Sequence, residues 1–132
     1  MNYKTHLLFA ASIGVYLNQP IKSFIILLIG SLLPDIDHPK AKFGQLIRPI
    51  NYLFTHRGFF HTPLFALILW YFSAPLALGA ASHILLDTLT PKGTMPLHPF
   101  LRTKLRGFVP TGGLFEFLTQ MILILIIGIM FL

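Results

Sequence analysis

The sequence predicts an all-α protein, an integral membrane helical bundle of two short helical hairpins followed by a C-terminal transmembrane helix. Hydrophobic residues make up 55% of the 132 residues and charged residues only 11%, whereas soluble domains carry about 25% charged residues. The apolar residues fall into five stretches divided by short polar or proline-containing breaks. We expect a single domain over residues 1–132, in which residues 1–110 form the hairpins and loops and residues 111–132 form the last helix.

Prolines and glycines set the limits of the expected helices. The Asn-Gln-Pro sequence at residues 18–20 predicts a tight turn between the first two helices. Pro75 separates the third helix from the fourth, because proline disfavours helix at itself and at the preceding residue. Thr62 followed by Pro63 is typical of a helix N-terminus, and Gly112 separates the last helix from its loop. The expected helices cover residues 5–17, 21–33, 63–71, 74–89 and 114–132.

Positively charged residues predict the orientation in the membrane. The first four apolar stretches are shorter than the roughly 20 residues that span a bilayer squarely, so the count of membrane segments is four or five. Five segments, the favoured count, place nine of the ten Lys and Arg residues on one side and only Lys22 at an opposite turn. Because basic loops stay in the cytoplasm, we expect a multi-pass protein of the bacterial inner membrane, with its N-terminus and both long loops on the cytoplasmic face.

Composition also limits other classes of function. The sequence has no cysteine, which excludes disulfides and thiolate metal ligands. The net charge of +6 follows the expected membrane topology, so we expect no nucleic-acid partner. The first apolar stretch has the length of a signal peptide, but no small-residue cleavage site leads into a soluble domain. We therefore expect this stretch to remain as a helix.

Most side chains able to bind metal gather in four short motifs at one end of the expected helices. Three of the four acidic residues and five of the six histidines belong to these motifs. Ionisable residues at the edge of a membrane segment are rare and usually functional. We therefore predict a metal site on this face of the membrane. The candidates are His6, Asp35, Asp37, His38, His56, His61, His83 and Asp87.

The spacing of the candidates fits metal binding. His83 and Asp87 are four residues apart, so both project from one face of the fourth helix. His56 and His61 are five apart with Gly58 between them, which predicts a turning loop that carries both toward the same ion or toward two ions. Imidazole and carboxylate groups favour zinc and also accept manganese or iron. We expect one or two divalent ions, with zinc the first choice.

Taken singly, the same residues have ordinary structural explanations. Asp35 or Asp37 alone could cap a turn, and His38 lies in a loop where it could be a ligand, support a ligand or face solvent. His98 has the surroundings of a structural or interfacial histidine. Glu116 falls in the first turn of the last helix, where the helix dipole favours an acid. The metal prediction therefore rests on the set of residues rather than on its members.

In these motifs the chain resembles the YdjM-type family of bacterial inner-membrane proteins, described as membrane-bound metal-dependent hydrolases. The matching segments lie within residues 1–100 and read MNYKTHLLFA, GSLLPDIDHPKAKFG, HRGFFHT, SHILLDTLTPKG and HPF. The family is distantly similar to the zinc-dependent phospholipase C and single-strand nuclease superfamily of helical enzymes. Phe60 stands where a small polar residue is expected before His61, which affects packing rather than ligation. The ligands implied by the resemblance are His6, Asp35, His56, His61, His83 and Asp87, with Asp37 nearby.

The resemblance and the expected location together predict hydrolysis of a phosphoester, such as a phospholipid or lipid-linked substrate at headgroup depth. A divalent ion lowers the pKa of its bound water from about 15.7 to about 7. We expect Asp37 to position or deprotonate that water. We expect Arg57, with Lys40 and Lys92, to hold phosphate oxygens, since guanidinium can bind them in pairs. The alternative for these residues is that they set the membrane topology and attract anionic headgroups.

The alternative is a non-catalytic membrane protein that uses the same ligands for metal binding, transport or assembly. Transport is the less favoured form, because transporters place polar groups at mid-depth and the interiors of these helices are almost wholly apolar.

Overall fold

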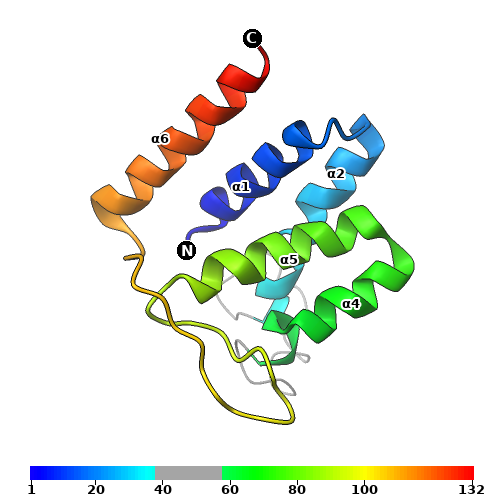
Figure 1. Cartoon of the computed structure of the whole chain (residues 1–132), viewed down its shortest axis with the longest axis vertical. Coiled ribbons are helices and arrows are strands. Elements are labelled where there is room, and N and C mark those ends of the chain that lie inside the picture. The colour runs from blue at the N-terminus through cyan, green and yellow to red at the C-terminus, as the bar shows by residue number, and fades with distance from the viewer. Residues whose placement is uncertain (38–57) are drawn as a thin grey trace.

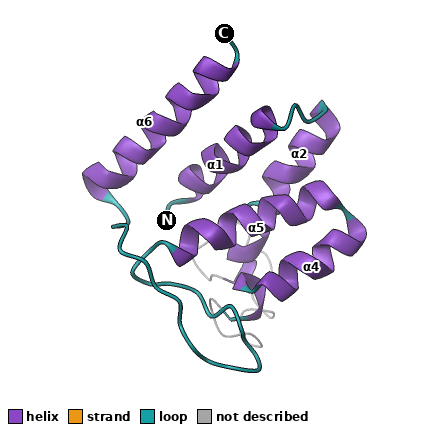
Figure 2. Cartoon of the chain, in the orientation of Figure 1, coloured by secondary structure: helices purple, strands orange, loops and turns teal. Residues whose placement is uncertain are grey.

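The computed structural model describes residues 1–37 and 58–132, which form helices joined by turns and one long loop. Within these two ranges no strand is present (Figure 2), although Thr94 and Leu105 form an isolated antiparallel bridge. The prediction of an all-α fold is confirmed. The elements are α1 (Tyr3–Tyr16), α2 (Ile21–Gly30), η1 (Leu33–Asp37), η2 (Phe59–His61), α4 (Pro63–Phe72), α5 (Ala74–Thr88) and α6 (Gly113–Met130), where η denotes a 3₁₀ helix.

Helix α5 lies at the centre of the bundle. It packs against α4, its partner in the second hairpin, and against both α1 and α2 of the first hairpin. Helix α6 packs along α1, so α1 lies between α6 and the rest of the bundle (Figure 1). The N-terminal end of α1 and the C-terminal end of α5 consequently meet at one end of the molecule.

The helix limits follow the expected signals, with one difference. The Thr62 hydroxyl caps α4 by accepting a hydrogen bond from the Phe65 N–H at 3.2 Å, and Pro63 opens that helix. Helix α2 ends at Gly30 rather than at residue 33. Pro34 explains this, because it has no N–H to donate to the Gly30 carbonyl four residues earlier and its ring clashes with that carbonyl. The chain then continues through η1, which carries Asp35 toward the centre of the molecule.

Two glycines allow α2 and α5 to cross with their backbones in contact. A Cβ atom on Gly79 would lie 2.0 Å from the carbonyl oxygen of Leu27, and one on Gly30 would lie 2.2 Å from the carbonyl oxygen of Leu76. Both distances are far below van der Waals contact, so neither position accepts a side chain at this separation. Small residues serve the same purpose where helices pack in membranes. The crossing brings the C-terminal end of α2 against the middle of α5.

Among the described helices, α6 alone is long and apolar enough to cross a bilayer. Its 18 residues extend about 27 Å, close to the thickness of the hydrocarbon core. Helices α2 and α4 are apolar but have ten residues each, which is about 15 Å. Of the five expected membrane spans, the structure therefore directly supports one, which is α6.

Candidate metal centre

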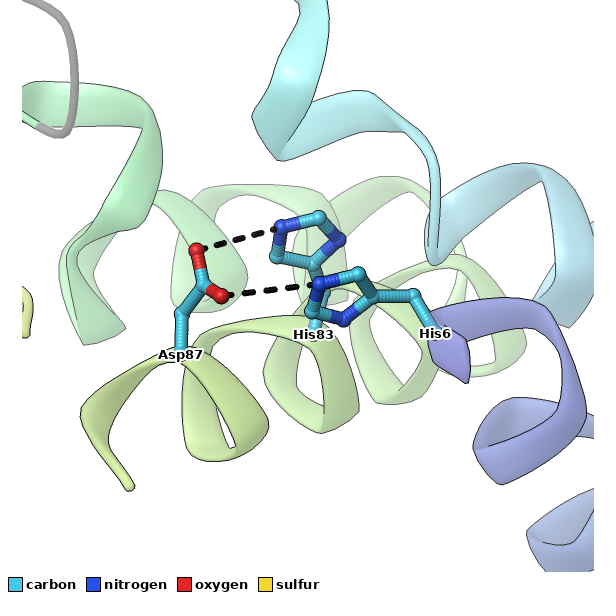
Figure 3. A group of neighbouring side chains, drawn as sticks. All are labelled: His6, His83 and Asp87. Atoms are coloured by element: carbon cyan, nitrogen blue, oxygen red, sulfur yellow. Dashed lines mark ion pairs between the residues drawn. The ribbon is translucent and has the colours of Figure 1, made fainter. Parts of the chain in front are cut away.

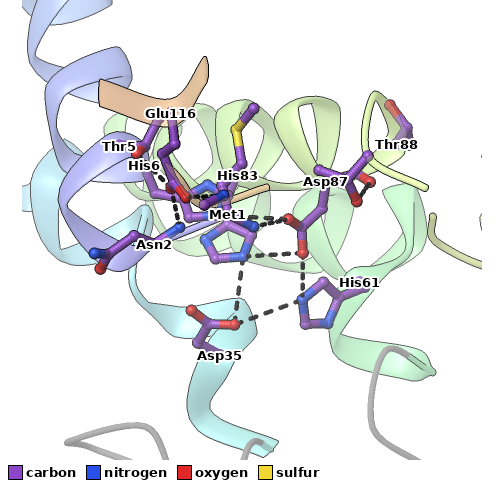
Figure 4. Close-up of polar contacts among 12 residues, drawn as sticks. Met1, Asn2, Thr5, His6, Asp35, His61, His83, Asp87, Thr88 and Glu116 are labelled. Atoms are coloured by element: carbon purple, nitrogen blue, oxygen red, sulfur yellow. Dashed lines mark hydrogen bonds and ion pairs between the residues drawn. The ribbon is translucent and has the colours of Figure 1, made fainter. Parts of the chain in front are cut away.

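The meeting point of α1, α5, η1 and η2 is a cluster of histidine and aspartate side chains. His83 and Asp87 project from one face of α5, as their spacing predicts, and His6 reaches them from α1 (Figure 3). His61, at the end of η2, and Asp35, in η1, close the cluster from the other side (Figure 4). The three histidines and Asp87 are buried, whereas the Asp35 side chain is 27% exposed. Of these five side chains, Asp35 is therefore the one that is accessible from outside the cluster.

Two histidine nitrogens in the cluster each face the same two aspartate oxygens. Nε2 of His61 lies 3.5 Å from Oδ2 of Asp87 and 3.9 Å from Oδ1 of Asp35. Nε2 of His83 lies 3.7 Å and 3.6 Å from the same two oxygens. Ligands about 2.1 Å from a tetrahedral zinc ion are about 3.4 Å from one another. Each of these four nitrogen–oxygen pairs is therefore spaced as two ligands of one ion would be, and slightly farther apart than hydrogen bonds allow. The donors that lie within 4.8 Å of one another form two groups that share His83: Asp35, His61 and His83 in one, and His6, His83 and Asp87 in the other.

The tautomer and the ring orientation of His83 are set by the helix beside it. Its Nδ1 lies 2.6 Å from the carbonyl oxygen of Ser31, at the end of α2, and must donate to that acceptor. In the neutral ring Nε2 then carries a lone pair, which faces the carboxylates of Asp35 and Asp87. Nε2 has no hydrogen-bond partner in the described part of the chain. A lone pair directed at two carboxylates is repulsive unless a cation lies between them. Histidine ligands of metals commonly donate their other N–H in this way.

Asp87 connects this group of donors to His6. While its Oδ2 faces His61 and His83, its Oδ1 lies 3.5 Å from Nε2 of His6 and 3.1 Å from the amino nitrogen of Met1. The His6 ring stacks on the His83 ring, with centroids 3.6 Å apart and planes 7° from parallel. One carboxylate thus has different donors at its two oxygens, which is an arrangement that can bridge two ions.

The structure brings together five of the eight side chains that the sequence nominated as metal candidates. Their role as ligands remains a prediction. The backbone of Asp37 closes η1, and its side chain lies outside what the structure describes. His38, His56 and Arg57, with Lys40, fall among the residues that are not described. His98 lies outside the cluster, as expected. The five grouped residues are His6, Asp35, His61, His83 and Asp87.

Sequence reasoning missed a second buried acid, Glu116, which ties α6 to the start of α1. Its Oε1 accepts hydrogen bonds from the backbone N–H of Asn2 and from the Thr5 hydroxyl at 2.8 Å, and its Oε2 accepts one from the N–H of Gly112 at 2.7 Å (Figure 4). The helix dipole seemed a sufficient reason for an acid here. The better signal was that an acid in an apolar membrane helix almost always has a partner. The contact holds the turn that carries His6.

Replacing Glu116 by glutamine is expected to lower the free energy of unfolding by about 1.5–3 kcal/mol, the usual contribution of hydrogen bonds to a charged group. The amide would retain the shape of the side chain but direct an N–H₂ group at a donor. Thermal unfolding in detergent, followed by circular dichroism, measures the change. Thr119→Ala, which removes a half-buried hydroxyl bonded to the Phe115 carbonyl of its own helix, should stay within about 0.5 kcal/mol of the parent protein. Equal stability of Glu116→Gln and the parent protein would contradict this account of the contact.

The fold and the cluster define a class: a helical membrane protein with a buried His and Asp site of the kind that binds divalent metal. Comparison with known proteins identifies the group within that class. The chain belongs to the family described as YdjM inner membrane protein, whose model matches residues 1–131. This confirms the family resemblance seen in the motifs, and it supports an inner-membrane location.

Two relatives illustrate the similarity. The chain is 42% identical over 102 residues to the inner membrane protein YdjM of Escherichia coli strain K12, covering 62% of this chain and 52% of that protein. It is 35% identical over 103 residues to the uncharacterized protein YvsG of Bacillus subtilis strain 168, covering 67% of this chain and 64% of that protein. The chain thus spans between about half and two-thirds of the length of these relatives. No solved structure is significantly similar to the chain.

Proposed function

We propose that the protein is a membrane-bound metal-dependent hydrolase that acts on a phosphoester, such as a phospholipid or a lipid-linked substrate. The observation that carries the proposal is the orientation of His83. Its Nδ1 is committed to the Ser31 carbonyl, so its Nε2 lone pair is presented to two carboxylates across gaps of 3.6 and 3.7 Å. That geometry fits a divalent cation held between the donors. Zinc suits imidazole and carboxylate best, and manganese or iron would accept the same set.

Each side chain of the cluster has a distinct part in this proposal. Asp35, His61, His83 and Asp87 hold the cation, and the second oxygen of Asp87 extends the site toward His6, where a second ion could bind. When bound, a divalent ion supplies Lewis acidity that brings the pKa of a water to about 7. Asp35 is the most exposed of the donors, so we place the approach of substrate on its side.

The candidates outside the described residues complete the proposal. His56 and His38 would add ligands from the segment that precedes η2. Asp37, two residues beyond Asp35, would orient or deprotonate the attacking water. Arg57 would hold phosphate oxygens through its paired N–H groups.

The proposed location is the cytoplasmic face of the inner membrane, with the hairpins embedded alongside α6 in a multi-pass arrangement. The exposed basic residues of the long loop after α5 support this orientation, because such loops remain in the cytoplasm. In that orientation the metal centre lies level with lipid headgroups. A lipid phosphoester is then the substrate class that can reach it without leaving the membrane.

The test combines metal analysis with hydrolysis assays on protein purified in detergent. The parent protein should carry a divalent ion and hydrolyse chromogenic phosphodiesters, phosphomonoesters or phospholipids, and chelation followed by metal addition should remove and restore activity. His83→Ala should lose metal and reduce the rate by more than about 100-fold. His98→Ala, a histidine replaced outside the cluster, should retain both. Hydrolysis that persists in His83→Ala would overturn the proposal.

A non-catalytic role is the second candidate, and one observation favours it. Four of the five donors are buried, and structural metal sites are closed by protein ligands, whereas catalytic sites keep a position for water. A metal-loaded protein that hydrolyses none of the phosphoesters would support this role in metal binding or assembly. Transport is less favoured, because the donors gather at one end of the bundle.

A further inference from the structure

The loop between α5 and α6 has an unusual surface over residues 97–108, here called the basic apolar loop. Basic and large apolar side chains alternate along its second half, and all of them are exposed. Phe100 and Phe108 are 84% and 90% exposed, which is far more than a water-facing loop normally leaves to aromatic side chains. The exposed residues are Leu97, Phe100, Leu101, Leu105 and Phe108, together with Arg102, Lys104 and Arg106.

The base of this loop is fixed to the end of α5. Thr94 and Leu105 exchange two backbone hydrogen bonds of 2.9 Å, and the N–H groups of Gly107 and Val109 donate to carbonyls at the end of α5, at 3.1 and 2.9 Å. Gly107 approaches so closely that a Cβ atom there would lie 2.2 Å from the carbonyl oxygen of Leu89. The exposed side chains are therefore presented by a defined backbone.

The position of the loop along the chain places it at a membrane surface. Helix α6, the one described helix fit to span a bilayer, begins at Gly113, five residues after Phe108. Figure 1 shows the loop as a long excursion beyond the end of α5 that returns to the start of α6. Its residues consequently lie in or beside the headgroup layer on the side where α6 enters.

The charge of the loop is of one sign. From Thr88 to Gly112 the sequence contains Lys92, Arg102, Lys104 and Arg106 but no acidic residue. Within the described residues none of these four cations takes part in an ion pair. Basic residues beside a membrane attract anionic lipid, and aromatic and aliphatic side chains between them can enter the boundary of the acyl chains.

We infer that the basic apolar loop docks on anionic phospholipid, with Phe100 and Phe108 in the acyl boundary and Arg102, Lys104 and Arg106 on lipid phosphates. The loop binds a lipid surface rather than a protein, because its exposed side chains combine positive charges with apolar groups that stand apart from one another. This inference does not depend on the proposed hydrolysis. Docking of the loop would place anionic lipid close to the proposed metal centre, since the loop is hydrogen-bonded to Leu89, two residues after Asp87.

The test places a fluorescent reporter on the loop of the full chain. Trp70, the single tryptophan, is first removed by Trp70→Phe, and Phe108→Trp then provides the reporter. The protein is reconstituted in vesicles with equal parts of phosphatidylglycerol and phosphatidylcholine, and either lipid carries bromine as a quencher. Brominated phosphatidylglycerol should quench the reporter at least about threefold more strongly than brominated phosphatidylcholine, and high salt should reduce the difference.

Two variants separate charge recognition from simple membrane contact. Arg102→Gln, Lys104→Gln and Arg106→Gln together should equalise quenching by the two lipids, while helix content by circular dichroism stays that of the reporter protein. Lys22→Gln, which removes a basic residue in the first turn of α2, should leave the preference intact. Equal quenching by both lipids in the reporter protein would overturn the inference. So would the absence of quenching by either, because the loop would then lie outside the membrane.

Discussion

Asp87→Asn is expected to abolish metal binding almost completely. Among the residues that the structure describes, Asp87 is the one side chain that faces three histidines: Oδ1 faces His6, and Oδ2 faces both His61 and His83. Asparagine has nearly the same shape but lacks the negative charge that draws a cation to the site. Loss of residues that merely support metal ligands costs about 10–100-fold in affinity, so loss of this shared ligand should exceed the upper figure. Metal content after purification, followed by titration with zinc, measures the change.

Thermal unfolding distinguishes this loss from misfolding. An ion that binds only the folded state stabilises it by mass action, so chelation should lower the unfolding temperature of the parent protein. Asp87→Asn should unfold at the temperature of the chelated parent and show no response to zinc. Thr88→Ala, on the half-buried neighbour in the same helix, should behave as the parent does. An Asp87→Asn protein that still binds zinc with parental affinity would refute the assignment of the site.

Gly79→Ala is expected to have the second large effect, although it adds one methyl group remote from every donor. The new Cβ would meet the Leu27 carbonyl oxygen at 2.0 Å and the Ser31 nitrogen at 2.7 Å. These are backbone atoms, so α2 and α5 must move apart. Overpacking of this kind costs about 1–3 kcal/mol, and we expect the upper part of that range. Separation would also lengthen the hydrogen bond between His83 and Ser31, so zinc affinity should fall together with stability.

Gly128→Ala provides the matched control. Gly128 also lies within a helix, but nothing stands within 4 Å of a Cβ atom at that position. Alanine is the better helix former by about 1 kcal/mol, so this variant should unfold at or slightly above the parental temperature. Chemical or thermal unfolding in detergent and zinc titration, run side by side, compare the two variants. If both glycines accept alanine equally well, the close crossing of α2 and α5 does not hold the site together.

Local signals made the helices predictable. Proline and glycine punctuate this sequence at nearly every helix boundary, and Thr62 with Pro63 marks the start of α4 as expected. The early end of α2 was missed because its apolar run continues to Leu33, whereas the restriction imposed by Pro34 acts on the backbone. The spacing of His83 and Asp87 on one helix face was equally readable, since it depends on helical geometry alone.

The contacts that hold the side chains of the site in place could not be predicted in the same way. The acceptor that orients His83 is a backbone carbonyl, which every residue possesses, so no residue type marks Ser31 for this task. Its position follows from the contact of two helices at Gly30 and Gly79, and a glycine in a sequence does not reveal which helix it will face. Glu116 was visible as an isolated acid, but its partners at the start of α1 are more than 100 residues away.

The division of the donors between the two hairpins has a consequence for biogenesis. The first hairpin and η1 bring His6 and Asp35, while the second brings a histidine whose ring is turned correctly only by a carbonyl of the first. The proposed donor set is therefore complete only after the two halves have met. If the site binds metal as proposed, tight loading is expected to follow the docking of both halves within the lipid phase.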